Sequence, residues 1–358
     1  MPVLRQLYQQ LVYQIQILSP MVFIGFVLLH YLICWTGLSL AGEEALTDIV
    51  NFIYFCSVVG STVGFGDLSP SGDAGKLFLT FYMIPATIIL YAAGLTKIAW
   101  IFQTMREMNI KGQRDFSDYN DHVILFGWQP VIGKKTIECI LKDKKRANSK
   151  IIICTTDDQQ THPMLEHPDV RFACVSSYTD DQELERIALA RANRVMIHAL
   201  NDQDTITIAL KVSPLVRTSC HVVAFFNDES ASRLLDNHCR NIECFSDRTA
   251  EQLARSVQDP GASRGINQLL DPGKGATHYC LLIPESAPVM KVINLRLALM
   301  LDYNATLYGI SERKTGDDLR LNPDKDTTIT AGTYIHYIAQ ERLLAEDIDW
   351  DKAARWQL

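Results

Sequence analysis

Three long stretches without a charged residue dominate the first third of this 358-residue chain. No Asp, Glu, Lys or Arg occurs between Arg5 and Glu43, over residues 49–66, or over residues 77–96. A helix needs about 20 mainly apolar residues to cross a bilayer. Residues 21–41 and 77–96 are long enough, so they predict two membrane-spanning helices.

The middle stretch differs from the other two because it ends in Gly60, Gly64 and Gly66. Glycine is a poor residue for the end of a spanning helix, so we expect a short helix over about residues 46–60, followed by extended backbone. Such backbone is tolerated at membrane depth only where protein or water covers it. The sequence therefore predicts a segment that re-enters the membrane between the two spans.

The charges at the ends of the spans predict the orientation of the chain. The segment between the spans is acidic apart from Lys76, whereas the outer flanks carry Arg5 on one side and Lys97, Arg106, Lys111 and Arg114 on the other. Basic flanks stay in the cytoplasm. We expect a multi-pass protein of the cell (inner) membrane with cytoplasmic N- and C-termini. The long first apolar stretch argues against a cleaved signal peptide.

Composition excludes several function classes. The chain has 34 Lys+Arg against 41 Asp+Glu, a net charge of -7, so we expect no nucleic-acid partner. The nine cysteines form no CxxC pair, which is typical of cytosolic free thiols. His238, Cys239 and Cys244 lack a zinc spacing. The nucleophile-elbow, HExxH and Walker A motifs of enzymes do not occur.

The re-entrant segment carries the most informative run of the chain: Thr62, Val63, Gly64, Phe65, Gly66 and Asp67. A dehydrated cation needs a cage of oxygen atoms, which backbone carbonyls supply without adding formal charge. Successive carbonyls point one way when alternate residues are left-handed, and glycine adopts that conformation at least cost. The Thr62 hydroxyl adds an oxygen at the inner end. The preceding helix aims its negative end at the cavity, and Asp67 holds the outer mouth.

This run resembles the filter signature of the potassium-channel family, TVGYGD or TVGFGD, and it lies between two spans at the expected distance. The resemblance implies a homotetramer, because such a filter closes only when four copies meet on one axis. It also implies that K+ binds the carbonyls of Thr62, Val63, Gly64 and Phe65. Val59 and Phe55 depart from residues common behind the filter. These departures bear on inactivation and not on the ion. The alternative is a Gly-rich loop between two anchoring helices.

Three residues of the second span are candidates for the gate. In the family this span lines the inner cavity and bends to open, and Pro85 stands in the comparable region. Pro85 predicts either a hinge or a fixed kink, and Gly94 is a second candidate hinge. Lys97 would oppose cation flow if it faced the pore, but we favour snorkelling to lipid headgroups. Residues 1–16 predict an amphipathic helix on the inner membrane surface.

From residue 122 onwards, short apolar runs alternate with helical stretches. We expect strands at residues 122–127, 150–155, 171–175, 193–199, 221–226 and 242–245, and helices at residues 131–142, 181–190, 202–212, 229–237 and 248–257. This alternation predicts a parallel sheet covered on both faces. The expected fold class is a membrane α-helical pore of two transmembrane helices plus a pore helix, fused to a cytosolic Rossmann-like α/β lobe and a small α+β lobe.

The first turn of the predicted sheet departs from the dinucleotide fingerprint G-x-G-x-x-G. Gly127 fits the first glycine, but Gln129 and Ile132 replace the other two. Asp157 lies beyond the usual ribose-binding position. We therefore do not expect full NAD binding. Binding of a nucleotide or another small intracellular ligand at this edge stays open, and its candidate residues are Gly127, Trp128, Gln129, Thr155 and Asp157.

Residues 121 to about 260 resemble the RCK (regulator of potassium conductance) or TrkA-N domain, and DDQELERIALARAN at residues 180–193 is similar to its fourth-strand region. The following lobe is similar to TrkA-C. We expect a hairpin there between residues 321–326 and 332–338. The resemblance implies RCK domains paired in a gating ring and a small-molecule regulator. The expected parts are the helix 1–16, pore 17–108, linker 109–120, N-lobe 121–258, linker 259–275, C-lobe 276–347 and tail 348–358. We expect the tail to be either a docking element or a loose end.

One mechanism of the family does not carry over. Calcium-gated members use acids at the ends of the fourth and fifth strands, where this chain has His198, Phe225, Phe226 and Asn227. We do not expect Ca2+ there. The nearby acids, such as Asp202 and Asp228, are explained equally well as helix caps. His198 with His221 is either a pH sensor or, as we favour, a satisfied strand histidine.

The sequence therefore predicts a potassium-selective channel that an intracellular ligand gates through an RCK domain. Two alternatives stay open: a membrane-anchored nucleotide-binding enzyme and a regulatory subunit of a potassium transporter. The enzyme has the doubly wound fold in its favour but lacks a named catalytic acid or base. Transporter regulators usually lack a pore of their own, so residues 62–67 argue against the second alternative.

Overall fold

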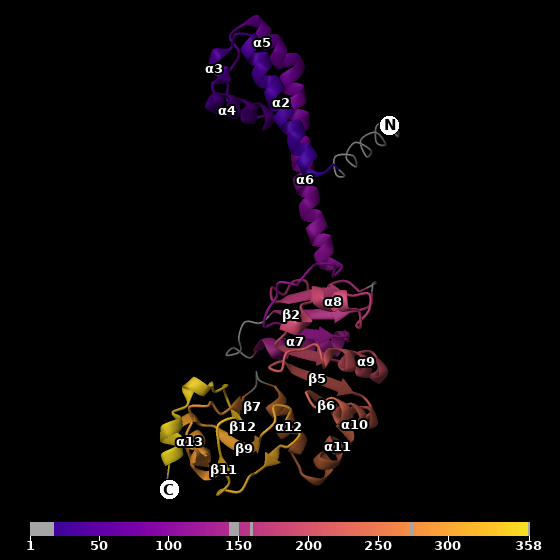
Figure 1. The fold of residues 1–358 in the computed structure, drawn as a ribbon, viewed down its shortest axis with the longest axis vertical. Helices are drawn as coiled ribbons and strands as arrows, with labels where there is room; N and C mark the ends of the chain where they lie inside the picture. The colour runs from indigo at the N-terminus through magenta and orange to yellow at the C-terminus, as the bar shows by residue number, and fades with distance from the viewer. Residues whose placement is uncertain (1–17, 143–149, 158–159, 272–274, 357–358) are drawn as a thin grey trace. The chain divides into compact units, whose positions relative to one another are not determined.

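The computed structural model describes residues 18–142, 150–157, 160–271 and 275–356. The chain forms two compact units, Met1–Glu107 and Met108–Leu358 (Figure 1). One buried core lies in the first unit, and the two lobes of the second unit have buried cores of their own. The helix predicted for residues 1–16 lies outside the described residues.

The first unit contains two helical stretches that are long and apolar enough to cross a membrane. The first is α2 (Pro20–Leu40), which begins after Ser19, whose hydroxyl accepts the N–H of Val22. The second is the continuous stretch of α5 (Asp73–Phe78), η1 (Leu79–Met83) and α6 (Ile84–Ile110). Both predicted spans are confirmed as helices, and the second continues well beyond residue 96.

A wide π-helical turn, η1, precedes the proline of the second span. The N–H of Ile84 bonds to the carbonyl of Leu79, one residue further back than in an α-helix. Pro85 has no N–H, and its ring crowds the carbonyl four residues earlier. A π-turn is one of the ways in which a helix relieves such crowding. The effect of Pro85 is therefore a local widening of the helix.

Two shorter helices, α3 (Glu44–Thr47) and α4 (Ile49–Gly60), lie between the spans. One helix was expected over about residues 46–60. Asp48 divides it, because its carboxylate accepts the N–H of Asn51 and caps α4. The unit's core packs α4 against α2 and η1 through Cys34, Leu38, Leu46, Phe52, Phe55, Cys56 and Met83. This packing fixes the position from which residues 61–67 leave α4.

The second unit begins with a six-stranded parallel sheet of order β3-β2-β1-β4-β5-β6. Its strands are β1 (Val123–Phe126), β2 (Ile151–Thr155), β3 (Val170–Cys174), β4 (Arg194–Ile197), β5 (His221–Phe226) and β6 (Ile242–Ser246). All six were predicted within two residues at either end. β1 and β2 are buried on both faces, as their continuous apolar sequences require. The predicted Rossmann-like fold is confirmed.

The helices of this lobe are α7 (Pro130–Lys142), α8 (Asp181–Arg186), η2 (Leu189–Arg191), α9 (Asp202–Val212), α10 (Glu229–His238), α11 (Thr249–Gln258) and α12 (Ala262–Leu270). α8 is shorter than expected because Ala188 adopts a left-handed φ of 52° and the chain turns there into η2. α12 occupies part of the segment expected to be a linker, residues 259–275. Its Ile266, Leu269 and Leu270 have helical spacing, which the neighbouring glycines concealed.

The C-terminal lobe has a four-stranded antiparallel sheet of order β10-β9-β12-β7 and a two-stranded ladder of β11 and β8. Its elements are β7 (Thr277–Leu282), β8 (Met290–Lys291), α13 (Val292–Tyr303), β9 (Thr306–Ser311), β10 (Arg320–Leu321), β11 (Thr328–Ile329), β12 (Tyr334–Ala339), η3 (Ala345–Asp347) and α14 (Trp350–Arg355). The hairpin expected between residues 321 and 338 is wrong. β12 pairs with β7 and β9, whereas β10 pairs with β9.

The C-terminal tail is part of this lobe. Trp350 and Ala353 of α14 are buried in the same core as α13 and β12. The side-chain amide of Asn294 donates to the carbonyl of Ala354 at 2.7 Å, and the indole of Trp356 donates to Asp302 at 2.9 Å. Residues 348–356 are therefore packed against the lobe, and the expectation of a loose end is wrong for them.

Candidate conduction and ligand sites

The candidate filter segment, residues 62–67, leaves the C-terminal end of α4 as extended backbone with an alternating conformation. Thr62, Gly64 and Gly66 have positive φ angles of 61°, 59° and 77°. Alternate left-handed residues were expected at the two glycines. Thr62 was not expected, because a β-branched residue rarely adopts this conformation, which costs about 1–2 kcal/mol. Such strain is typical of functional segments.

Gly64 and Gly66 are needed for their backbone conformation and not because a larger side chain would be crowded. Nothing lies within 4 Å of a Cβ added at Gly64 or Gly66. The side chains between them, Val63 and Phe65, are 55% and 70% exposed in the single chain. This alternation turns the side chains to one side of the segment and the backbone carbonyls to the other. Carbonyl oxygens along one side of a backbone can replace the water around a cation.

A hydrogen bond from α4 fixes the C-terminal end of this segment. The hydroxyl of Tyr54, on α4, donates to a carboxylate oxygen of Asp67 at 2.7 Å. Sequence reasoning considered Phe55 here and missed Tyr54. Phe55 is buried in the core of the unit. Tyr54 is an aromatic residue with a hydroxyl donor, and it stands one position before the apolar Phe55. A donor of this kind beside a buried ring is the signal that could have identified Tyr54.

Glu43 fixes the loop that follows the segment. One of its carboxylate oxygens accepts the N–H of Ser71 at 2.9 Å and the Ser71 hydroxyl at 3.1 Å, and the other accepts the N–H of Gly72 at 2.8 Å. These donors, the Ser71 N–H first, hold the pKa of Glu43 below its ordinary value. Gly75 leaves room for this carboxylate, since a Cβ there would lie 2.5 Å from it.

The three gate candidates have different surroundings in the second span. Pro85 follows the π-turn. A Cβ at Gly94 would lie 3.6 Å from the ring of Phe23, which is an ordinary contact. The amine of Lys97 donates to the backbone carbonyl of Leu18, just before α2, and Lys97 is only 6% exposed. Neither the pore-facing nor the snorkelling interpretation of Lys97 describes this contact.

A second polar contact joins the two spans. Nε2 of His30, on α2, hydrogen-bonds to the hydroxyl of Thr87 on α6 at 3.0 Å, and both side chains are buried. His30 and Thr87, together with Gly94, line a cavity of about 240 Å³. Sequence reasoning missed His30. A titratable residue inside an otherwise uncharged span is the signal, because such residues are costly in a membrane and are usually paired.

The candidate ligand edge lies at the carboxyl ends of β1 and β4, where open α/β sheets bind ligands. Gly127 has a φ of 87°, and a Cβ there would lie 2.2 Å from the carbonyl of His198, so this glycine is required. The side-chain amide of Gln129 hydrogen-bonds to Nε2 of His198 at 2.9 Å and to the carbonyl of Ala199 at 3.3 Å.

Trp128 and Thr155 complete this edge. The ring of Trp128 packs on Gly133 so closely that a Cβ there would lie 2.7 Å from it. Thr155 is buried at the end of β2, and its hydroxyl accepts the N–H of Asp157 at 3.2 Å. Because Gln129 bridges the turn to β4 and a hydroxyl stands at the end of β2, the edge does not fit a dinucleotide bound in the usual way.

The acids and histidines near this edge have local partners. The carboxylate of Asp202 accepts the N–H groups of Asn227 and Asp228, and Asp228 caps α10. Burial lowers the pKa of His198. Nε2 of His221 lies 3.1 Å from a carboxylate oxygen of Glu243. Within the described ranges, no group of three or more His, Cys, Asp or Glu residues is arranged to hold a metal ion.

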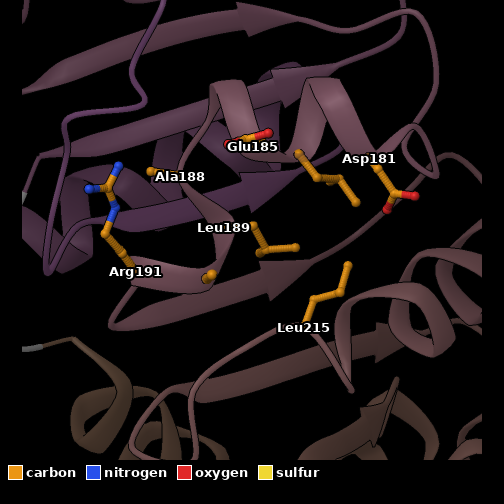
Figure 2. Close-up of a pocket in the computed structure, with 8 residues that line it drawn as sticks. Asp181, Glu185, Ala188, Leu189, Arg191 and Leu215 are labelled. Atoms are coloured by element: carbon orange, nitrogen blue, oxygen red, sulfur yellow. The ribbon is translucent and has the colours of Figure 1, made fainter.

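A cavity of about 550 Å³ opens in the same lobe between α8, η2 and the loop after α9 (Figure 2). Leu184, Leu189 and Leu215 give it apolar surface, and Figure 2 shows Asp181 and Arg191 on opposite sides of it. Its volume is in the range of small-molecule sites. Sequence reasoning missed this cavity, because no motif joins its separated segments.

Residues 21–111 match a protein-family model described as "Ion channel". Potassium channel protein 1 of Methanocaldococcus jannaschii is 22% identical over 81% of this chain and 85% of that protein. The calcium-gated potassium channel TvoK of Thermoplasma volcanium is 20% identical over 84% and 86%. A GsuK channel structure with bound NAD is 18% identical with a TM-score of 0.44, covering 89% of this chain and 56% of that chain. The chain thus spans little more than half of that solved channel.

Residues 21–111 are therefore similar to an ion-channel domain, and they are followed by a Rossmann-like parallel sheet and a small antiparallel lobe. The chain's family match is to channels and not to enzymes.

Proposed function

Because residues 21–111 match an ion-channel family, we propose that this protein is a potassium-selective channel gated by an intracellular ligand. The observation that carries the proposal is the alternation of left-handed residues at Thr62, Gly64 and Gly66 within the sequence TVGFGD. Two curated relatives along most of the chain bear the name of potassium channels, which supports the same ion.

In this proposal the carbonyls of Thr62, Val63, Gly64 and Phe65 replace the hydration shell of K+, with the Thr62 hydroxyl at the inner end. The C-terminal end of α4 carries the negative end of the helix dipole, which favours a cation in the inner cavity of the proposed pore. Asp67, held by Tyr54, keeps the outer mouth in position. Four copies surround one axis, and the exposed side chains of Val63 and Phe65 would then face neighbouring protein.

The proposed topology follows from charge. The loop between the spans is acidic and the flanks are basic, so both termini would be cytoplasmic in the cell (inner) membrane. The parts are the pore at 17–108, the linker at 109–120 and the RCK lobes at 121–258 and 276–347.

For gating, we propose that RCK regions pair in a ring and that ligand binding moves α6 through the linker. A ligand shifts this equilibrium only if it binds one conformation better than the other. The candidate edge around Gln129 and the 550 Å³ cavity are the two places for a small regulator. Because the first does not fit a dinucleotide, we expect a smaller ligand there. Pro85 and Gly94 are the positions at which α6 would bend.

Flux from liposomes tests the conduction proposal. Purified protein in vesicles with a potassium gradient is expected to pass K+ and not Na+, and Ba2+ is expected to block the flux. Gly64→Ala is expected to abolish selective flux, because alanine is strained at a φ of 59°. Gly25→Ala is the matched control, since it also meets nothing within 4 Å but lies in the regular helix α2. Equal K+ and Na+ flux through the wild type would refute the proposal.

A further inference from the structure

The environment of Lys97 is unusual for a charged residue at the inner end of an apolar helix. Its side chain is 6% exposed, and its amine donates to the carbonyl of Leu18 and lies 5.6 Å from the ring centre of Trp100. A buried ammonium group is costly unless it is hydrogen-bonded. The Leu18 carbonyl belongs to the backbone that enters α2, so this bond joins the start of the first span to the end of the second.

The His30–Thr87 bond holds the same two helices further along. Thr87 and Gly94 line one cavity with residues of α2, so they lie on the side of α6 that faces α2. Gly94 thus separates two polar contacts: His30–Thr87 before it, and Lys97–Leu18 three residues after it. Glycine is the least helix-stabilising residue apart from proline, so a bend of α6 between the contacts is easiest at Gly94.

Such a bend cannot leave both contacts in place. A hydrogen bond with a nitrogen donor is lost once donor and acceptor separate beyond about 3.5 Å. The His30–Thr87 contact is in the buried interior of the unit. The Lys97 contact is at the inner end, where water and headgroups are able to replace it. Lys97 is therefore the contact that opens when the inner end of α6 moves.

We propose that Lys97 is a positioning residue of the gate: its bond to Leu18 latches the inner end of α6 to the start of α2 and stabilises the conformation in which they touch. This inference rests on the proposed channel function. It assigns Lys97 an effect on the open–closed equilibrium and none on ion passage, because its amine is held by its own subunit and not presented to the permeating ion.

Single-channel recording separates this role from a pore-facing one. Lys97→Met keeps the length of the side chain and removes the bond. The expected result is a change in the ratio of open to closed time on the order of tenfold, the worth of a charged hydrogen bond. Unitary conductance and the K+/Na+ reversal potential are expected to stay at wild-type values. Lys97→Arg, which keeps a donor, is expected to restore most of the ratio.

Thr96→Val is the matched control. Its hydroxyl bonds within its own helix, to the carbonyl of Ala92, so the open–closed ratio is expected to be unchanged. An altered unitary conductance in Lys97→Met with an unchanged ratio would overturn the latch and return Lys97 to the pore. An unchanged ratio and conductance would overturn it as well.

Hydrogen exchange tests the latch without relying on current. In the full-length protein in detergent, Lys97→Met is expected to raise amide exchange at residues 21–24 and 96–101, whereas exchange in β4 and β5 stays constant. Wild-type exchange rates in both helical segments would exclude the latch whatever the protein conducts. If the wild type carries no K+ current but exchange rises as expected, the contact stands and the channel proposal fails.

Discussion

At the residue scale, the most informative contacts join positions that no short motif connects. Tyr54 and Asp67 are 13 residues apart, Glu43 and Ser71 are 28 apart, and His30 and Thr87 are 57 apart. Tertiary packing sets such pairs, whereas sequence patterns report local spacing. Individual residues of the candidate filter segment could be named from the sequence, but the groups that hold them could not.

The Tyr54–Asp67 bond gives a prediction about the stability of the conducting filter. Tyr54→Phe removes the hydroxyl donor and keeps the ring. A hydrogen bond of this kind contributes about 1 kcal/mol. We expect K+ selectivity to be retained and the decay of current during sustained conduction to become about fivefold faster. Planar-bilayer recordings of steady currents measure this rate.

A double-mutant cycle with Asp67→Ala, which removes the acceptor, is the control for that prediction. If the bond carries the effect, the two substitutions together are expected to speed the decay no more than the stronger one alone. Effects that add would show that Tyr54 acts through other contacts.

At the element scale, the sequence predicted helices and strands where one physical pattern dominates. Charge-free stretches of sufficient length predicted α2 and the second span, and alternating apolar runs predicted β1 to β6. The prediction of an element was wrong where two sequence signals competed. Glycines around α12 concealed its apolar spacing, and the turn residues near residue 323 indicated a hairpin although the strands find other partners. In a small antiparallel lobe, which strands pair depends on the shared core, which no local pattern specifies.

Helix α14 gives a prediction about the C-terminal lobe. Trp350 is buried in its core, and its indole donates to the carbonyl of Ala345 at 2.9 Å. Trp350→Ala is expected to destabilise the lobe by about 3 kcal/mol, the usual cost of truncating a buried tryptophan. Hydrogen exchange of β12 in the full-length protein reports the loss as faster exchange.

Lys352→Ala is the matched variant on the same helix. It removes an exposed ion pair with Asp302, 3.0 Å long, and exposed pairs contribute little. We expect less than about 0.5 kcal/mol. Equal effects of the two substitutions would mean that α14 is held by its surface and not by the core.

At the scale of the whole molecule, the two units present different kinds of evidence. The first unit has the motif for which we propose K+ binding, and the backbone of this motif alternates between ordinary and left-handed conformations, as that proposal needs. The second has a fold that many functions share, so its ligand has to be argued from side chains. Those side chains depart from the fold's usual nucleotide chemistry at Gln129 and Thr155, which stand where a glycine and an acid are expected.

These departures predict how the full-length protein responds to nucleotides. The Gln129 amide lies between the first turn and β4, where a pyrophosphate would approach the backbone, and β2 ends in Thr155, where the usual fold has an acid for a ribose hydroxyl. We therefore expect calorimetric titration with NAD, or with its ADP half, to show no saturation up to about 1 mM, equivalent to about -4 kcal/mol. Saturable binding that Gln129→Ala weakens would place a nucleotide at this edge after all. Saturable binding that Gln129→Ala leaves unchanged but Arg191→Ala abolishes would place it in the 550 Å³ cavity.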